Sequence, residues 1–127
     1  MRAPPRRSLL ALATLLLASG AAVATDSNKW RLECSGGADS AGVVTLRITP
    51  KGGAPTDVVV AIKDNTSENA VARAIRDALK AEVGDRYRTE IDDGEDVLVK
   101  KRGGQPDFEL VVLDNTVKGV RVGRERE

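Results

Sequence analysis

Alternating apolar and polar residues recur along most of this chain and predict a protein built mainly from β-strands, because a period of two places every second side chain on one face of a strand. The first clear example is residues 29–35, in which Trp30, Leu32 and Cys34 share one face. The same alternation returns at residues 44–49, 58–62, 87–91, 97–101, 108–113 and 120–122. Because residues 58–62 are apolar on both faces, we expect this strand to be central in its sheet.

One stretch, residues 65–84, departs from this alternation and has the period of a helix. Its apolar residues fall three and four positions apart, which places them in one stripe on a helix surface. These residues are Val71, Ala74, Ile75, Ala78 and Leu79. Asn65 or Thr66 is expected to cap the first turn, and Gly84 is expected to end the helix. Because the stripe is small and rich in Ala, the helix is predicted to lie close against a sheet.

Glycine-rich and acidic turns separate the predicted strands. Residues 36–42 are expected to join the first two strands as the long loop of a hairpin, and residues 50–55 to break the pattern before the third strand. Asp92-Asp93-Gly94 supplies a tight hairpin turn, since Asp-Gly tolerates positive φ angles. The predicted fold class is therefore α+β: a mostly antiparallel sheet of about seven short strands, in the order βββαββββ, with one amphipathic helix packed on one face.

Residues 1–24 have the layout of a secretory signal peptide. Arginines precede a short apolar run at residues 9–18, and the small residues Ala-Val-Ala at 22–24 form a cleavage pattern. The apolar run has about half of the roughly 20 residues that a membrane-spanning helix needs, so stable membrane insertion is not expected. We predict cleavage after Ala24. The twin-arginine export route, suggested by Arg6-Arg7, remains an alternative to export of the unfolded chain.

The rest of the chain is expected to form one domain at residues 25–123, followed by a tail at 124–127 that lacks apolar residues and should fray. Arg outnumbers Lys 13 to 7, which favours a bacterial origin and hence a periplasmic or secreted protein. The signal holds three of the 20 Lys and Arg residues and none of the 19 Asp and Glu residues, so the mature chain is slightly acidic. This balance shows no general attraction to nucleic acid or to an anionic membrane.

The chain lacks most of the side chains on which catalysis and metal binding depend. It contains no His, which removes the commonest general base and the commonest transition-metal ligand. Its one Cys cannot form an internal disulfide or supply a zinc site. No glycine-rich phosphate-binding motif follows a predicted strand. We therefore predict no catalytic residues, no cofactor, no metal site and no enzymatic activity.

Three local features are candidates for chemistry, and each also has a simpler structural interpretation. Residues 92–96 hold Asp92, Asp93, Glu95 and Asp96, which suit either calcium or glycosyl chemistry, or a solvated hairpin tip. Lys100-Lys101-Arg102 suits either contact with an anionic envelope polymer or a strand end in water. Cys34 is either a reactive thiol or, because it lies in phase with Trp30 and Leu32, a buried apolar residue. The simpler interpretation is preferred for each feature.

These observations favour an exported, non-catalytic interaction or structural module of the bacterial cell envelope that acts through contacts with a protein partner. One alternative is a secreted inhibitor that blocks a hydrolase through the loops at residues 36–42 and 50–55. A second alternative is a carboxylate-dependent enzyme at the 92–96 hairpin. The strand-rich plan also leaves sheet edges, to which an extended segment of another protein can add.

Overall fold

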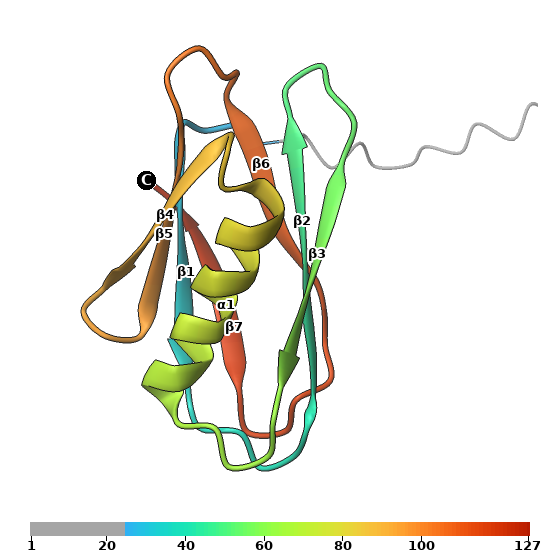
Figure 1. The fold of residues 1–127 in the computed structure, drawn as a ribbon, viewed down its shortest axis with the longest axis vertical. Helices are drawn as coiled ribbons and strands as arrows, with labels where there is room; N and C mark the ends of the chain where they lie inside the picture. Colours follow the sequence, from blue (N-terminus) through green and yellow to red (C-terminus); the bar gives the residue numbers. More distant parts are fainter. Residues whose placement is uncertain (1–24) are drawn as a thin grey trace, which may run out of the picture.

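The computed structural model describes residues 25–127 (Figure 1), so the predicted signal peptide at residues 1–24 lies outside the described residues. The elements are β1 (Lys29–Ser35), β2 (Gly42–Pro50), β3 (Thr56–Ile62), α1 (Glu68–Val83), β4 (Tyr87–Asp92), β5 (Asp96–Lys101), β6 (Phe108–Asn115) and β7 (Arg121–Arg126). Their order and antiparallel pairing confirm the predicted α+β class. No helix in this part of the chain is long and apolar enough to cross a membrane.

The strands form two sheets where one sheet was expected. The first sheet has the order β4-β5-β1-β7 and the second has the order β3-β2-β6. The predicted hairpin between the first two strands is therefore wrong, because residues 36–42 carry the chain from β1 in one sheet to β2 in the other. Alternation identifies a half-buried strand, but it does not identify the strand's partner.

β3 lies at a sheet edge, which corrects the prediction that this strand is central. It pairs with β2, and β2 takes the central position between β3 and β6. Val58, Val60 and Ile62 are buried. Val59 is 61% exposed, and Ala61 is exposed as well. The second apolar face of β3 is thus part of the surface and is not a second buried face.

The C-terminal segment that was expected to fray, residues 124–127, forms the second half of strand β7 with its first three residues. Its pairing with β1 continues to Arg126, which lies opposite Trp30. The backbone N–H of Glu127 donates a further hydrogen bond to β1. Arg124 stacks its guanidinium 5.0 Å from the centroid of the Trp30 ring and donates to the carbonyl of Leu110 on β6. The prediction was wrong because backbone pairing and a stacked guanidinium hold a segment that has no apolar anchor.

The N-cap of helix α1 is Ser67, one residue after the expected Thr66 and two after the expected Asn65. Ser67, and neither Asn65 nor Thr66, accepts the N–H of Ala70 on its side-chain oxygen at 3.3 Å. The helix ends at Val83, immediately before Gly84, as predicted. The buried side chains of the helix are Val71, Ala72, Ile75, Leu79 and Val83.

α1 lies between the two sheets and does not cover one face of a single sheet (Figure 1). It contacts β3 of the second sheet and β1, β4 and β5 of the first. β6 and β7 lie side by side where the two sheets meet. β3 and β4 border the opposite opening, which α1 closes. The helix thus joins the edge strands β3 and β4 in the sequence and also contacts both of them.

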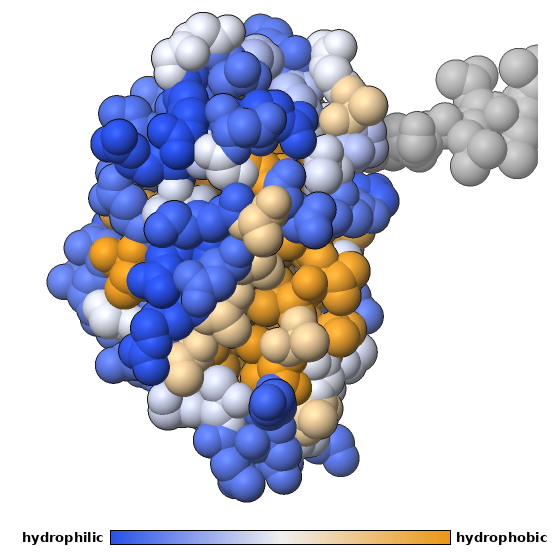
Figure 2. Space-filling view, in the orientation of Figure 1, coloured by the Kyte–Doolittle hydropathy of each residue, from blue (hydrophilic) through white to orange (hydrophobic). Residues whose placement is uncertain are grey.

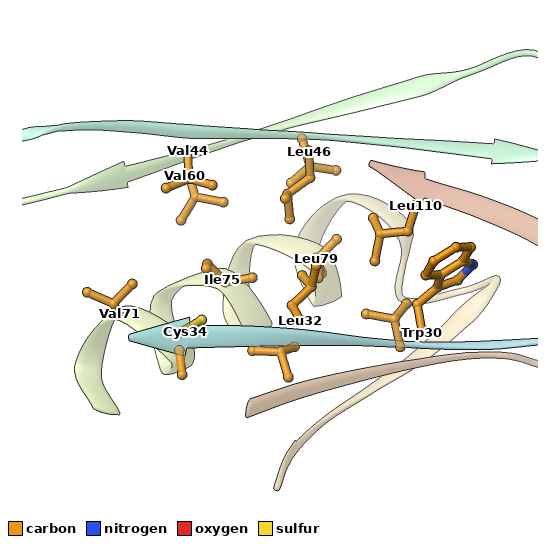
Figure 3. Packing of buried hydrophobic residues seen from close by; sticks show 14 of the residues in the cluster. Trp30, Leu32, Cys34, Val44, Leu46, Val60, Val71, Ile75, Leu79 and Leu110 are labelled. Carbon is orange, nitrogen blue, oxygen red and sulfur yellow. The ribbon is translucent and has the colours of Figure 1, made fainter. Parts of the chain in front are cut away.

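The inner faces of both sheets and of α1 form one continuous core (Figure 3). Leu32 of β1, Leu46 of β2 and Leu79 of α1 are all fully buried in it. Tyr87 and Phe108 pack with their ring centroids 4.6 Å apart. This core fixes the outward-facing residues of each strand, on which any binding site must be built.

Candidate functional site

The acidic hairpin between β4 and β5 is organised around Arg31 of β1. The Arg31 guanidinium lies 3.0 Å from the Asp92 carboxylate and 2.8 Å from the Asp96 carboxylate, and it also pairs with Glu127. Hydrogen bonding to Arg31 lowers the pKa of Glu127. Asp93 is exposed at the turn with a φ of 50°. The hairpin therefore belongs to an ion-pair network that joins β4, β5, β1 and the C-terminus.

Sequence reasoning missed Arg31 and Glu127 as members of this cluster. Arg31 alternates with Trp30 and Leu32, so its outward direction was readable from the pattern. Its partners depend on the register of β1 with β5 and on the pairing of β7 with β1. Neither register is encoded in a local pattern, and the tail that contains Glu127 was expected to fray.

A second acidic contact joins Glu33 of β1 to Glu125 of β7. A hydrogen bond with Glu125, together with repulsion between the two carboxylates, raises the pKa of Glu33. Both residues are exposed. Within residues 25–127, no group of three or more His, Cys, Asp and Glu side chains is arranged to hold a metal ion. On the outer face of the first sheet, Asp92 and Asp96 are thus paired with Arg31, whereas Glu33 and Glu125 contact each other.

Cys34 and the three aromatic residues lie in the core, as the strand pattern predicted. Cys34 is buried, and burial raises the pKa of its thiol to about 12. A thiol that stays protonated is a poor nucleophile. Trp30, Tyr87 and Phe108 are also buried, and the Trp30 indole N–H donates to the carbonyl of Phe108 at 2.8 Å. None of these rings is placed to bind a ligand at the surface.

The two loops proposed for an inhibitor differ in how firmly they are held. In the 36–42 loop, Ala38 is buried and exchanges backbone hydrogen bonds with the loop before α1. Gly36, at φ 82°, lies so close to Gly119 that an added Cβ would sit 2.0 Å from the Gly119 carbonyl oxygen. The 50–55 turn is largely exposed. Only the second loop is therefore presented as a projecting element.

The basic run lies at the end of β5 and its three residues have different surroundings. Lys101 pairs with Asp107 at 2.8 Å. The Nε of Arg102 donates to the Gly84 carbonyl at 2.8 Å. Lys100 is exposed on the outer face of the first sheet, on the opposite side of the strand from Lys101.

Four strands border the two sheets in the described part of the chain: β4, β7, β3 and β6. β4 carries charged residues at alternating positions and β7 carries four charged residues, and such charges discourage pairing with another strand. β6 has a register shift and lies beside β7. β3 differs from these three strands, because its segment from Val58 to Ile62 has no charged residue, no Pro and no register shift.

The exposed edge of β3 combines unpaired backbone with apolar surface. Beyond its ladder with β2, no backbone group of β3 has a backbone hydrogen-bond partner among the described residues. Val59 is the most exposed large apolar residue in this part of the chain. Figure 2 shows apolar surface gathered over β3 and continuing onto the adjacent surface of α1, whereas hydrophilic surface covers most of the remaining face in view. This edge is the clearest candidate for contact with a partner.

A search against known protein families and a search of curated proteins find no match to this chain. A function for it therefore rests on the residues and the geometry described above.

Proposed function

We propose that this chain is an exported, non-catalytic interaction module of the bacterial cell envelope, and that it binds an extended segment of a protein partner along the edge of β3. The observation that carries the proposal is the unprotected edge at residues 58–62, within which Val59 is 61% exposed. Such an edge presents a row of backbone donors and acceptors to which another strand can pair. Natural sheets usually guard an edge with charge, Pro or a bulge.

The surroundings of β3 also define the chemistry of the partner segment. Side chains on one face of an added strand would lie beside Val59 and Ala61. Side chains on its other face would meet α1, where Ala74 and Ala78 are partly buried and small. Because alternate side chains face opposite sides of a strand, the partner segment should be apolar at every position near its centre and carry its charges near its ends.

Export is the second part of this proposal, and it rests on the pattern of residues 1–24. We expect the mature protein to begin at Thr25 and to be found in the periplasm or in the medium. N-terminal sequencing of the protein from fractionated cells and from culture fluid tests this point. A cytoplasmic protein that retains residues 1–24 would end the envelope assignment.

The absence of catalysis is likewise a proposal, supported by the state of the candidate groups. Asp92 and Asp96 are paired with Arg31, and the Cys34 thiol is buried and protonated. Asp92→Asn combined with Asp93→Asn would abolish a carboxylate-dependent activity at this hairpin. Turnover of an envelope substrate that this double substitution abolishes would replace the interaction module with an enzyme.

A photo-crosslinking amino acid placed at position 59 tests the β3 edge directly. The same group at position 113 is a matched control, because Leu113 is 45% exposed on β6 of the same sheet. The protein is exported by its own signal, irradiated in cells, and its crosslinks are identified by mass spectrometry. We expect one dominant envelope protein to be joined at position 59 and much less of it at position 113.

Hydrogen exchange on the purified complex then establishes how the partner binds. We expect the amides of β3 to gain protection on binding, because an added strand pairs with the exposed edge. Val59→Lys should weaken binding, whereas Leu113→Lys should leave it unchanged. Equal crosslinking at both positions, or a partner that binds without protecting β3, would show that the edge is not the binding site.

A secreted inhibitor remains the second candidate, because the 50–55 turn projects from the end of the β2–β3 hairpin. Its residues are largely exposed, and its backbone is shaped by a hydrogen bond from Gly53 to Pro50 at 2.8 Å. If the partner is a hydrolase whose activity falls on binding, replacing Lys51 and Pro55 with Ala should abolish inhibition without changing the fold. Inhibition that survives this change but is lost in Val59→Lys would assign it to the β3 edge.

A further inference from the structure

The outer face of the first sheet carries a row of three cations. Lys100 of β5 lies opposite Lys29 of β1 on one side and opposite Arg88 of β4 on the other. Neighbouring strands are about 4.8 Å apart, so the three side chains leave the same face at adjacent positions. Like charges directly opposite one another destabilise a sheet. The row therefore costs the fold stability, and a purely structural role does not explain it.

Two adjacent hollows lie along this cationic row. The first has a volume of about 230 Å³ and is lined by Arg88, Lys100, Lys101, Arg102 and Gly103. The second has a volume of about 210 Å³ and is lined by Lys29, Arg88, Glu90, Leu98 and Lys100. Because both hollows include Arg88 and Lys100, these two side chains stand between them and can contact a group in either one.

Cations outnumber carboxylates around the hollows, since five Lys and Arg side chains line them and Glu90 is the one acidic residue in their lining. Lys101 is paired with Asp107, but Arg102 donates its Nε to a backbone carbonyl, which carries no net charge. Arg88 and Lys100 have no carboxylate partner among the described residues. Elsewhere in the fold, arginines such as Arg31 form close ion pairs. The row is thus an exposed concentration of charge in a chain whose overall charge is nearly balanced.

We propose that the two hollows bind a phosphate-bearing polyanion, with neighbouring phosphate groups seated one in each hollow. The planar guanidinium of Arg88 suits bidentate contact with phosphate oxygens, and Lys100 supplies a compact charge between the two groups. A chain of at least two linked phosphates gains from both hollows at once, whereas a single phosphate fills one. This binding site is on the opposite sheet from β3 and does not depend on the proposed partner.

The same face disfavours two other kinds of polyanion. Single-stranded nucleic acid is usually held by bases stacked on exposed aromatic rings, and Trp30, Tyr87 and Phe108 are all buried. An anionic membrane surface would extend over the far end of the sheet face, where Asp92 and Asp96 lie. A narrow, flexible phosphate chain avoids Asp92 and Asp96, and in the second hollow the single carboxylate of Glu90 is outnumbered by Lys29, Arg88 and Lys100.

Titration calorimetry of the purified mature protein with tripolyphosphate at low salt tests the proposal. We expect binding that weakens as salt is added, and much weaker binding of orthophosphate. Lys100→Gln should weaken tripolyphosphate binding roughly tenfold, the order of effect expected when a hydrogen bond to a charged group is lost. Lys118→Gln is the matched control, because Lys118 is also exposed but lies in the turn before β7.

A short poly(glycerol phosphate) chain distinguishes the two sources of linked phosphate. Tighter binding of this chain than of tripolyphosphate indicates a phosphodiester polymer, and the reverse indicates a free oligophosphate. Lys100→Gln should also raise the thermal unfolding midpoint at low salt, because it relieves the like-charge row.

Three results would overturn the proposal. The first is equal affinity of Lys100→Gln and Lys118→Gln for tripolyphosphate, and the second is no binding of either phosphate chain. The third is tighter binding of a single-stranded DNA of matched charge, or of phosphatidylglycerol vesicles, than of either phosphate chain. That last result would assign the surface to nucleic acid or to a membrane instead.

Discussion

At the scale of single residues, two buried hydroxyl groups on β4 lower the stability of the core. The hydroxyl oxygens of Tyr87 and Thr89 are buried and have no hydrogen-bond partner among the described residues. Burial raises the pKa of Tyr87, so its hydroxyl stays protonated at neutral pH. The Trp30 indole, in contrast, has its bond to Phe108. A buried polar group without a partner costs about 1–3 kcal/mol.

Tyr87→Phe is therefore expected to leave the free energy of unfolding unchanged or to raise it by about 1 kcal/mol. The substitution removes the hydroxyl and keeps the ring contact with Phe108. Trp30→Phe is the comparison, because it removes a hydrogen bond that is made and should lower the same free energy by about 1–3 kcal/mol. Urea unfolding measures both variants. A clear loss of stability in Tyr87→Phe would mean that the hydroxyl has a partner.

At the scale of elements, strand β7 shows how a segment without an apolar pattern can still be ordered. Removing residues 124–127 deletes the pairing of Arg124, Glu125 and Arg126 with β1. We expect this truncation to lower the free energy of unfolding by about 2 kcal/mol or more, from several net hydrogen bonds and the guanidinium stacked on Trp30. Chemical denaturation of the truncated and full-length proteins measures the change.

A frayed tail would give the opposite result. Truncation would then change the free energy of unfolding by no more than the roughly 0.5 kcal/mol typical of surface changes. Lys118→Gln, at an exposed position outside the ladder, sets this baseline. The truncation thus distinguishes a frayed tail from an ordered strand β7 in one measurement.

The ion pairs at the end of β7 also predict a pH dependence of stability. Arg31 lowers the pKa of Glu127 from its ordinary value of 4.5. The stabilisation is therefore complete above that ordinary value and is lost as the pH falls through the lower pKa of the folded state. Glu127→Gln should lower the thermal unfolding midpoint near neutral pH, and the difference from the parent should shrink as the pH falls below about 4.5.

Glu82→Gln is the control for this pH series, because Glu82 is exposed on α1 away from Arg31. It should unfold like the parent at every pH. A difference in Glu127→Gln that stays constant down to strongly acidic pH would show that Glu127 acts through something other than its charge.

The sequence predicted which elements exist better than how they pair. The alternation at 29–35 and the helical stripe around Ile75 are local properties, and both elements formed. Pairing is not local: β1 joins β5 and β7, and its sequence neighbour β2 belongs to the other sheet. The same limit of a local pattern applies to Val59 at the candidate site. The apolar second face of residues 58–62 predicted a central, buried strand, but Val59 lies on an exposed edge strand.

At the scale of the whole molecule, the two sheets and α1 divide the surface into regions of different chemistry. The gap between β3 and β4 is closed by α1, which leaves the edge of β3 bordered by apolar surface. The outer face of the first sheet is divided between the acidic network around Arg31 and the cationic row at Lys100. The basic run was visible in the sequence, but Lys29 and Arg88 join Lys100 only through the register of three strands.

Because one core unites both sheets with α1, the domain should unfold as a single cooperative unit. Leu79 of α1 is fully buried in the core that both sheets share (Figure 3). We expect Leu79→Ala to lower the free energy of unfolding by about 3 kcal/mol, since it removes buried methyl groups and leaves a cavity. Val59→Ala, at an exposed position, should change it by no more than about 0.5 kcal/mol.

Native-state hydrogen exchange shows whether this loss is shared across the molecule. If α1 couples the sheets, the slowest amides of β2 and of β5 should lose protection by the same free energy in Leu79→Ala, because both exchange only on global unfolding. Loss of protection in one sheet alone would mean that the two sheets open independently. The edge of β3 would then belong to a unit that unfolds separately from the first sheet. In that case, binding of a partner strand should protect amides throughout the second sheet as well as those of β3.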